Sequence, residues 1–429
     1  MAAANRLALE GGKKAVKTAA PAWPVVTDED AAVVAEVVKS GKWSWLGPHE
    51  IAFCEEYAKF IGAKHCICLA NGTVTIQCAL QAVGVRPGDE VIAPGLTWVA
   101  TIQAALDIGA NVVMVDIDPE TLCMDPAAAR AAVTPRTKAL LPVHLYGNMC
   151  DMDAILALAK ERGLKVVEDV AHQHGSQWRG VGAGALGDAG SFSFQQSKVL
   201  TCGEGGAVTC NDDEVRRVVF GLKQVGWAPK PGVAAEPGKP PALEPANLYG
   251  HNYRITEMQA ALLRRGLLRL EEQTKRREEN AAYLAAGLAK MGGPLRAARR
   301  DARVTRQAYY CMHFVFDPAK AGLTRDEYCK ALAAEGVPFG KPYAPVYRHP
   351  LLNLYHPTSP VPFRSCVPQA FHSLRLPNVE RACEETAMLM GQTMLLGSRK
   401  LMDEILAAVD KVNRNLKRVR KALAAQQTA

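Results

Sequence analysis

Lys198 follows an alternating apolar stretch and precedes a run of glycines, in "SFSFQQSKVLTCGEGG" at residues 191–206. Glycine-rich loops after strands often hold phosphate, but this order fits neither G-x-x-x-x-G-K-[ST] nor G-x-G-x-x-G. The lysine is therefore either an ordinary surface residue or a group with chemistry of its own. Lysine side chains form Schiff bases with carbonyl compounds, and a buried site helps by lowering the pKa of the amine.

A second candidate is "NGT", where a short apolar run meets a helical pattern at Gly72 and Thr73. Glycine lets backbone amides approach a ligand closely, and a helix N-terminus carries partial positive charge. The triplet is thus either a phosphate seat or a simple turn with a helix cap.

A third candidate is "VVEDVAHQHG", in which Glu168 and Asp169 end an apolar strand pattern. A carboxylate there could be catalytic, could bind a cation, or could cap the next segment. His172 and His174 follow, but H-x-H with one acid is a weak metal signal, so a polar cluster without metal is favoured.

The three segments together indicate a cofactor. Pyridoxal phosphate requires a lysine, an acid beside its ring nitrogen, a phosphate seat and a flat group over the ring. The chain offers these in order as Gly72–Thr73, Trp98, Asp169 and Lys198.

The elements around these residues alternate between strands and helices up to about residue 220. Apolar runs such as "EVIAP", "NVVMV" and "KVVED" alternate with amphipathic segments such as "DMDAILALAKERG". This order predicts an α/β fold with a mainly parallel sheet covered on both faces. Ligands of such sheets lie beyond the carboxyl ends of the strands, where all three candidates fall.

The pattern changes after residue 220. The proline-rich residues 227–247 are predicted to form a long exposed loop. A long helix follows, with capping-box spacing between Thr256 and Gln259, and then a smaller α+β region. We expect an N-terminal arm at 1–27, a large cofactor-binding domain at 28–262 and a small C-terminal domain at 263–429.

Composition excludes several other classes of protein. Among 429 residues, the net charge of +8 is diffuse, so nucleic acid is not favoured as a partner. Twelve scattered cysteines, including the pair Cys66 and Cys68, resemble neither a disulfide framework nor a zinc site and indicate a reducing compartment. With no signal-peptide pattern and no apolar run long enough for a membrane span, we expect a cytoplasmic protein.

Six segments resemble the pyridoxal-phosphate-dependent sugar and cyclitol aminotransferases of the DegT/StrS type, a fold-type-I group. They are "LANGT", "PGLTWVATIQAALDIGA", "VHLYGNMCDM", "VVEDVAHQHGSQWRG", "GDAGSFSFQQSKVLTCGEGGAV" and "GHNYRITEMQAAL". The resemblance covers about residues 5 to 415 and leans toward glutamine-dependent scyllo-inosose aminotransferases and aminohydroxybenzoate synthases.

The resemblance implies roles for the catalytic groups. Lys198 would bind the cofactor covalently and move the transferred proton. Asp169 would pair with the pyridinium nitrogen and make the ring an electron sink. Trp98 would stack on the ring face. Lys198 also argues against the deoxygenating dehydratases of the same family, in which histidine replaces this lysine.

The resemblance also implies how the cofactor is held. Gly72, Thr73 and Ser193 would bind its phosphate, and Asn252 would reach the phosphate of a neighbouring subunit in a homodimer. His172 stands where the family usually has a glutamine that contacts the phenolic oxygen; a histidine can still donate a hydrogen bond there.

The expected function is transfer of an amino group from L-glutamine or L-glutamate to a keto-sugar or keto-cyclitol. One alternative is an aromatising dehydratase like 3-amino-5-hydroxybenzoate synthase, and another is a pyridoxal-phosphate-binding regulator without turnover. The segment "KPYAPVYRHP" at residues 341–350 is either a supplier of cationic and aromatic groups to the site or a proline-rich linker.

Overall fold

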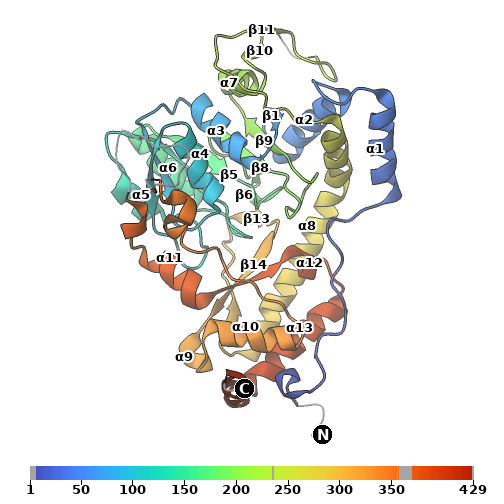
Figure 1. The fold of residues 1–429 in the computed structure, drawn as a ribbon, viewed down its shortest axis with the longest axis vertical. Coiled ribbons are helices and arrows are strands. Elements are labelled where there is room, and N and C mark those ends of the chain that lie inside the picture. The colour runs from blue at the N-terminus through green and yellow to red at the C-terminus, as the bar shows by residue number, and fades with distance from the viewer. Residues whose placement is uncertain (1–5, 234–235, 355, 357–369, 428–429) are drawn as a thin grey trace.

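The computed structural model describes residues 6–233, 236–354, 356 and 370–427. A seven-stranded sheet forms the centre of the larger part of the molecule (Figure 1). Its strands lie in the order β1-β9-β8-β5-β4-β2-β3. Their bounds are β1 His65–Leu69, β2 Glu90–Pro94, β3 Asn111–Val115, β4 Thr137–Leu140, β5 Lys165–Asp169, β8 Ala189–Ser193 and β9 Gly206–Cys210.

The sheet is mainly parallel, as the alternating pattern predicts. Pairs β2–β3, β2–β4, β4–β5 and β5–β8 are parallel, whereas β9 runs antiparallel to both of its neighbours. Strands β2, β8 and β9 are buried along their whole length, which explains why their sequences are apolar or small apart from Glu90 at the start of β2. The predicted α/β fold class is therefore confirmed.

Helices cover the sheet and begin where the sequence supplies a cap. Asn71, Asp125, Asp151 and Asp212 each accept backbone N–H groups at a helix start. The helices of this part are α1 Asp28–Ser40, α2 Pro48–Ile61, α3 Gly72–Ala82, α4 Val99–Asp107, α5 Pro126–Ala132, α6 Met152–Arg162 and α7 Asp213–Lys223.

The predicted long exposed loop contains a short ribbon at its two ends. Strands β10 (Trp227–Pro229) and β11 (Leu243–Pro245) pair antiparallel, so the prediction of a loop throughout is wrong at these positions. The sequence does not predict these strands, because three residues within a proline-rich stretch are too few to show a strand pattern. Another small sheet joins β6 (Gln177–Trp178), β7 (Val181–Gly182) and β13 (Val304–Arg306).

The 35-residue helix α8 (Glu257–Met291) runs from the larger part into the smaller part (Figure 1). Its start has the predicted capping box, because Thr256 and Gln259 exchange side-chain and backbone hydrogen bonds. The predicted domain boundary at residues 262 and 263 falls within this helix, and the division into domains stays a prediction.

The smaller part has its own sheet and its own hydrophobic core. Strands β12 (Leu295–Ala297), β14 (Cys311–Phe316) and β15 (Ala387–Gly391) form an antiparallel sheet in that order. Leu7 of the N-terminal arm is buried in this core. The helices here are α9 Pro318–Ala321, α10 Arg325–Ala334, α12 Gln392–Leu395, α13 Arg399–Asn413 and α14 Leu416–Gln427, whereas α11 (Pro377–Arg381) packs on the core of the larger part through Val379.

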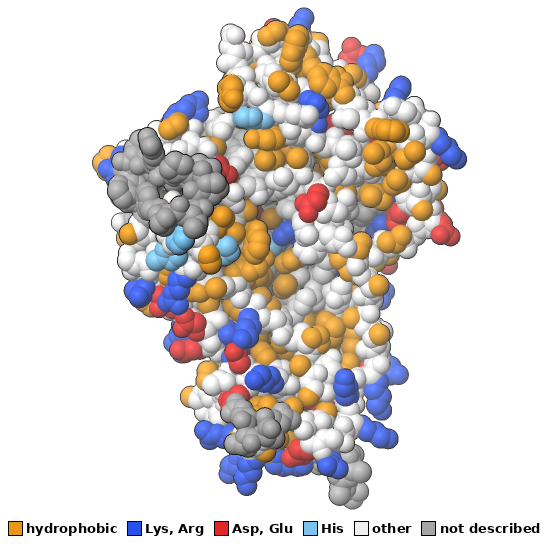
Figure 2. All heavy atoms as spheres, viewed as in Figure 1, with side chains coloured by type: hydrophobic (Ala, Val, Ile, Leu, Met, Phe, Trp, Pro, Cys, Tyr) orange, Lys and Arg blue, Asp and Glu red, His pale blue; other side chains and the backbone are white. Residues whose placement is uncertain are grey.

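The surface carries both charges, and Lys and Arg side chains gather over the end of the molecule where α10, α13 and the C-terminus lie (Figures 1 and 2). None of the helices in the described ranges combines the length and apolar character needed to cross a bilayer.

Candidate active site

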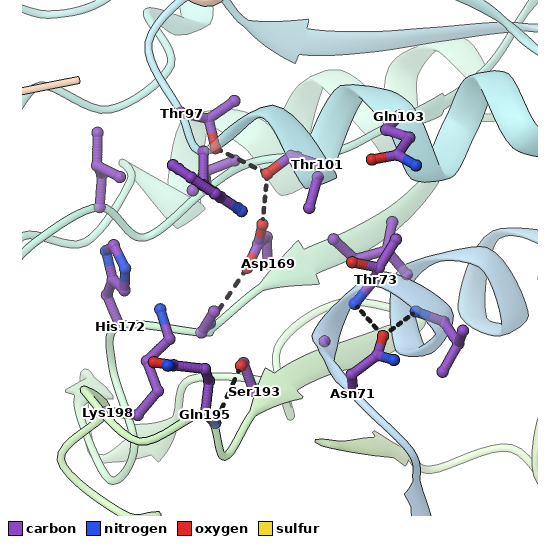
Figure 3. A pocket seen from close by; sticks show the side chains of 18 of the residues that line it. Asn71, Thr73, Thr97, Thr101, Gln103, Asp169, His172, Ser193, Gln195 and Lys198 are labelled. Atoms are coloured by element: carbon purple, nitrogen blue, oxygen red, sulfur yellow. Dashed lines mark hydrogen bonds between the residues drawn. The ribbon is translucent and has the colours of Figure 1, made fainter. Parts of the chain in front are cut away.

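A cavity of about 720 Å³ lies beyond the carboxyl ends of β5 and β8, at the N-termini of α3 and α4. Figure 3 shows polar side chains from these elements around it. Seven of the eight predicted site residues line this cavity: Gly72, Thr73, Trp98, Asp169, His172, Ser193 and Lys198. The fold thus brings together segments that are more than a hundred residues apart in the chain.

Lys198 lies in the tight loop between β8 and β9. Its Nζ is 4.9 Å from the centre of the Tyr310 ring. Burial lowers the pKa of the Lys198 amine to about 8, although the nearby negative charge of Asp169 acts in the opposite direction. A substantial fraction of this amine is therefore neutral near physiological pH, and a neutral amine can attack a carbonyl carbon.

Asp169 is the last residue of β5 and only 5% exposed. One carboxylate oxygen accepts a 2.8 Å hydrogen bond from the Thr101 hydroxyl, and the other accepts a 3.1 Å bond from the Ala171 amide. Burial raises the pKa of Asp169. The Thr101 hydroxyl is in turn 2.7 Å from that of Thr97 (Figure 3), so α4 and its preceding loop fix the orientation of the carboxylate.

His172 is buried and its ring stacks on Tyr310, with centroids 4.0 Å apart and planes 15° apart. Its Nδ1 lies 3.1 Å from the Tyr146 backbone N–H, which can only donate. The neutral ring therefore carries its proton on Nε2. Burial, and then the charge of Lys198, lower the pKa of His172 well below its ordinary value, so the imidazole stays neutral. A neutral ring donor at Nε2 matches the role that the resemblance implies.

The start of α3 has the features of a phosphate seat. A Cβ atom on Gly72 would lie 2.8 Å from the Cβ of Ser193, closer than real contacts allow, so this approach of helix and strand requires glycine. The Asn71 side chain accepts hydrogen bonds from the backbone amides of Thr73 and Val74. Gly72, Thr73 and Ser193 all line the cavity, and a backbone amide and two hydroxyls are donors of the kind that bind an anion.

Trp98 and Asn252 occupy more open positions. Trp98 immediately precedes α4, is 54% exposed and lies 5.3 Å, centroid to centroid, from the Tyr343 ring across the cavity mouth. Asn252 is exposed outside the cavity, where it forms an isolated bridge with Gln224. Its predicted reach into a neighbouring subunit stays a prediction, as do the roles of the other site residues.

The structure separates Glu168 and His174 from the chemistry. Glu168 is fully buried and accepts hydrogen bonds from the amides of Gly184, Leu186 and Gly187 and from the imidazole of His144. His174 pairs with the hydroxyl of Tyr57. Both therefore hold the fold together, and of the neighbouring acids Glu168 and Asp169 it is Asp169 that lines the cavity.

Sequence reasoning did not find several residues of the site. Tyr310 and Tyr343 come from the smaller part and close the cavity opposite α4. Tyr343 belongs to the segment 341–350, for which the sequence leaves open a supply of aromatic groups to the site or a linker, whereas Tyr310 follows no motif. Gln195 also lines the cavity, and its side chain accepts hydrogen bonds from Ser197, whose hydroxyl contacts Tyr310 at 3.0 Å.

The site fits pyridoxal phosphate: it offers an amine, a buried acid, an anion seat and aromatic walls in one cavity. Together with the mainly parallel sheet and the smaller second part, these residues define a transferase fold of the fold-type-I, pyridoxal-phosphate-dependent class.

Comparison with known proteins identifies the family. The profile of the DegT/DnrJ/EryC1/StrS aminotransferase family matches residues 24–394, and the chain belongs to this family. An L-glutamine:2-deoxy-scyllo-inosose aminotransferase from Streptomyces fradiae is 39% identical over 95% of this chain and 98% of its own length. A protein of the same name from Streptoalloteichus tenebrarius is 38% identical, with the same coverage of both chains.

Solved structures agree with this assignment. An aminotransferase from Psychrobacter cryohalolentis superimposes with a TM-score of 0.82 at 30% identity, covering 93% of this chain and all of that one. The structure of 3-amino-5-hydroxybenzoic acid synthase superimposes with a TM-score of 0.78 at 31% identity, covering 92% of this chain and 99% of that one. The protein is thus an aminotransferase-family enzyme, as its sequence predicts.

Proposed function

We propose that this protein transfers the amino group of L-glutamine to a keto-cyclitol, with pyridoxal phosphate as its cofactor. The observation that carries the proposal is the convergence of Lys198, Asp169 and the Gly72 seat in one cavity. When bound, the cofactor supplies an aldehyde that exchanges amino groups and a ring that accepts electrons.

The side chains of the site supply the remaining chemistry. The Lys198 amine, with its lowered pKa, holds the cofactor and then carries a proton between the two carbon atoms that exchange it. Asp169, oriented by Thr101, keeps the ring nitrogen protonated. His172 donates from Nε2 to an oxygen on the ring.

The charges around the cavity favour an uncharged acceptor. Among the described residues that line it, the ionisable groups besides Lys198 and Asp169 are two histidines, three tyrosines and two further acids, Asp107 and Glu204, and there is no arginine. A nucleotide-linked sugar would place two phosphates near these acids. A neutral cyclitol instead finds hydroxyl, amide and carboxylate partners, in keeping with the names of the relatives.

The test is a single-turnover spectrum of the cofactor-loaded protein with L-glutamine, L-glutamate and L-alanine in turn. We expect L-glutamine to bleach the visible absorbance band of the bound pyridoxal phosphate and 2-deoxy-scyllo-inosose to restore that band. A nucleotide keto-sugar serves as the competing acceptor. If no donor bleaches the band of the loaded protein, the proposal is wrong.

Two variants connect this test to the site. Lys198→Ala should still take up pyridoxal phosphate, because the phosphate seat remains, yet lose transamination. Asp169→Asn should keep the fold and lose most activity, because the ring nitrogen no longer stays protonated. Wild-type rates in either variant would contradict the role given to that residue.

The structural likeness to 3-amino-5-hydroxybenzoic acid synthase favours one second candidate, an aromatising dehydration with Lys198 as base. That reaction releases an aromatic product with new ultraviolet absorbance and consumes no amino donor. Product absorbance in the absence of L-glutamine would therefore replace the first proposal with the second.

We also propose a cytoplasmic homodimer in which Asn252 completes the site of the other subunit. The eleven described cysteines are free, which suits a reducing compartment. The exposed position of Asn252 leaves it available to a second copy. Light scattering should give the mass of a dimer. Mixing Lys198→Ala with Asn252→Ala subunits should restore part of the activity that neither variant has alone. A fully active monomer would exclude this arrangement.

A further inference from the structure

Three cysteine side chains meet away from the active-site cavity. Cys54 lies on α2, and Cys66 and Cys68 lie on β1. Their sulfur atoms all lie within 4.8 Å of one another, and those of Cys54 and Cys68 are 3.6 Å apart. In the sequence Cys66 and Cys68 form only a C-x-C pair, because the third thiol is supplied by the packing of α2 against the strand.

The spacing of the sulfurs suits a shared metal ion. Metal–sulfur bonds of about 2.3 Å place the ligands of one ion roughly 4 Å apart, whereas a disulfide needs about 2.05 Å. Among the described residues, this group contains neither histidine nor carboxylate. A set of thiols alone selects soft ions such as Cu(I) and Zn²⁺ over harder ones.

The framework around the thiols is held in place. Strand β1 places Cys66 and Cys68 on the same face, two residues apart, and pairs with β9 along its whole length. Cys68 is fully buried, whereas the residues Cys54 and Cys66 are partly exposed, so the cluster lies just below the surface.

A buried ion pair adjoins the cluster. The Lys223 ammonium is 1% exposed, contacts the Glu50 carboxylate, and acts electrostatically on all three thiols. The Lys223 ammonium favours the thiolate form of Cys54, whereas the Glu50 carboxylate paired with it opposes that form, and the proposed transamination uses neither group.

We propose that Cys54, Cys66 and Cys68 bind one thiophilic metal ion, and that this ion is monovalent copper. Zinc sites are typically four-coordinate, and the described chain offers three ligands here; a soft monovalent ion is satisfied by three sulfurs. Each thiol that binds the ion releases its proton to solvent, and no electron is transferred.

The test is an anaerobic titration of the cofactor-loaded protein with Cu(I), in competition with a chromophoric Cu(I) chelator. We expect one equivalent to bind tightly to the wild-type protein and to Cys78→Ser, whose buried cysteine on α3 lies outside the cluster. Cys54→Ser and Cys66→Ser should lose this equivalent. Equal uptake by Cys54→Ser and Cys78→Ser, or none by the wild type, would overturn the proposal.

A second measurement does not depend on any variant that fails to fold. X-ray absorption of the copper-loaded wild type should show sulfur neighbours only, three per ion. Nitrogen or oxygen neighbours would overturn the assignment of the ligands. Preferential uptake of Zn²⁺ over Cu(I) would overturn the choice of ion. Neither outcome bears on the proposed transamination, because the cluster contributes no residue to that cavity.

Discussion

Lys198 is the residue whose state depends most directly on its surroundings. Its amine has a pKa of about 8 because burial penalises the ammonium form. Only the neutral amine captures an aldehyde, and its fraction rises about tenfold per pH unit well below the pKa. The rate at which apoprotein takes up pyridoxal phosphate should therefore rise from pH 6 to about pH 8 and level off above, as followed by visible absorbance.

Asp169→Asn provides the control for this pH profile. The negative charge of Asp169 raises the pKa of Lys198, so its removal should move the midpoint of the profile to lower pH. A profile that climbs steadily to pH 10 in the wild type would show that the amine keeps an ordinary pKa.

Gly72 is the residue at which a single methyl group should matter most. Its Cβ would lie 2.8 Å from that of Ser193, so Gly72→Ala must push α3 away from β8. We expect the dissociation constant for pyridoxal phosphate to rise about tenfold or more, which corresponds to about 1.4 kcal/mol. Gly391→Ala, which meets open space at an ordinary backbone angle, is the matched control in the same equilibrium dialysis. Equal affinity of the two variants for pyridoxal phosphate would exclude a phosphate site that depends on the close contact of Gly72 with Ser193.

At the scale of elements, helix α2 depends on a side chain from another helix. Its first residue follows Gly47, which has no capping side chain. The carboxylate of Glu257, at the start of α8, accepts 2.8 Å hydrogen bonds from the His49 and Glu50 amides instead. The Glu257 side chain thus caps the N-terminus of α2 and fixes the position of α2 on α8.

Glu257→Ala should therefore lower the free energy of unfolding by about 2–3 kcal/mol, because one buried and one partly buried amide lose a charged acceptor. Urea unfolding of the apoprotein, followed by circular dichroism, measures the change. Glu272→Ala removes an exposed acid from the same helix and should change the free energy by less than about 0.5 kcal/mol. Similar losses in both variants would mean that the cap is not the cause.

At the scale of the whole molecule, the N-terminal arm is tied to the smaller part. Glu335 is 1% exposed and accepts hydrogen bonds from the Ala8 and Ala15 amides. The same carboxylate pairs with Lys411 of α13 at 2.8 Å. One side chain therefore joins the arm, the end of α10 and α13.

Glu335→Ala should release the arm while leaving the central sheet intact. We expect limited proteolysis to remove the arm roughly tenfold faster than in the wild type, because its backbone becomes accessible more often. Mass spectrometry identifies the cleavage sites. Lys330→Ala, an exposed change on α10, is the control. Unchanged cleavage in Glu335→Ala would show that other contacts hold the arm.

Local patterns in the sequence predict the class of fold and seven of the residues that line the cavity. The alternation of apolar and amphipathic segments is a property of neighbouring residues, as is the capping box of Thr256 and Gln259. Asp169 ends a strand, Gly72 and Lys198 follow strands, and the carboxyl ends of parallel strands meet at one edge of a sheet. For this reason the sequence alone predicts that they converge.

Contacts between distant segments were decided only by the tertiary structure. The stacking of Tyr310 on His172, the burial of Glu168 among three amides and the arrival of Cys54 beside Cys66 each join residues without a shared local pattern. Such contacts depend on how α2 and the smaller part pack against the sheet, and packing is set by the shapes of all the side chains together. The sequence alone therefore predicts which amine and which acid lie at the cavity. Only the three-dimensional structure shows that Tyr310 and Tyr343 line it and that three thiols meet elsewhere.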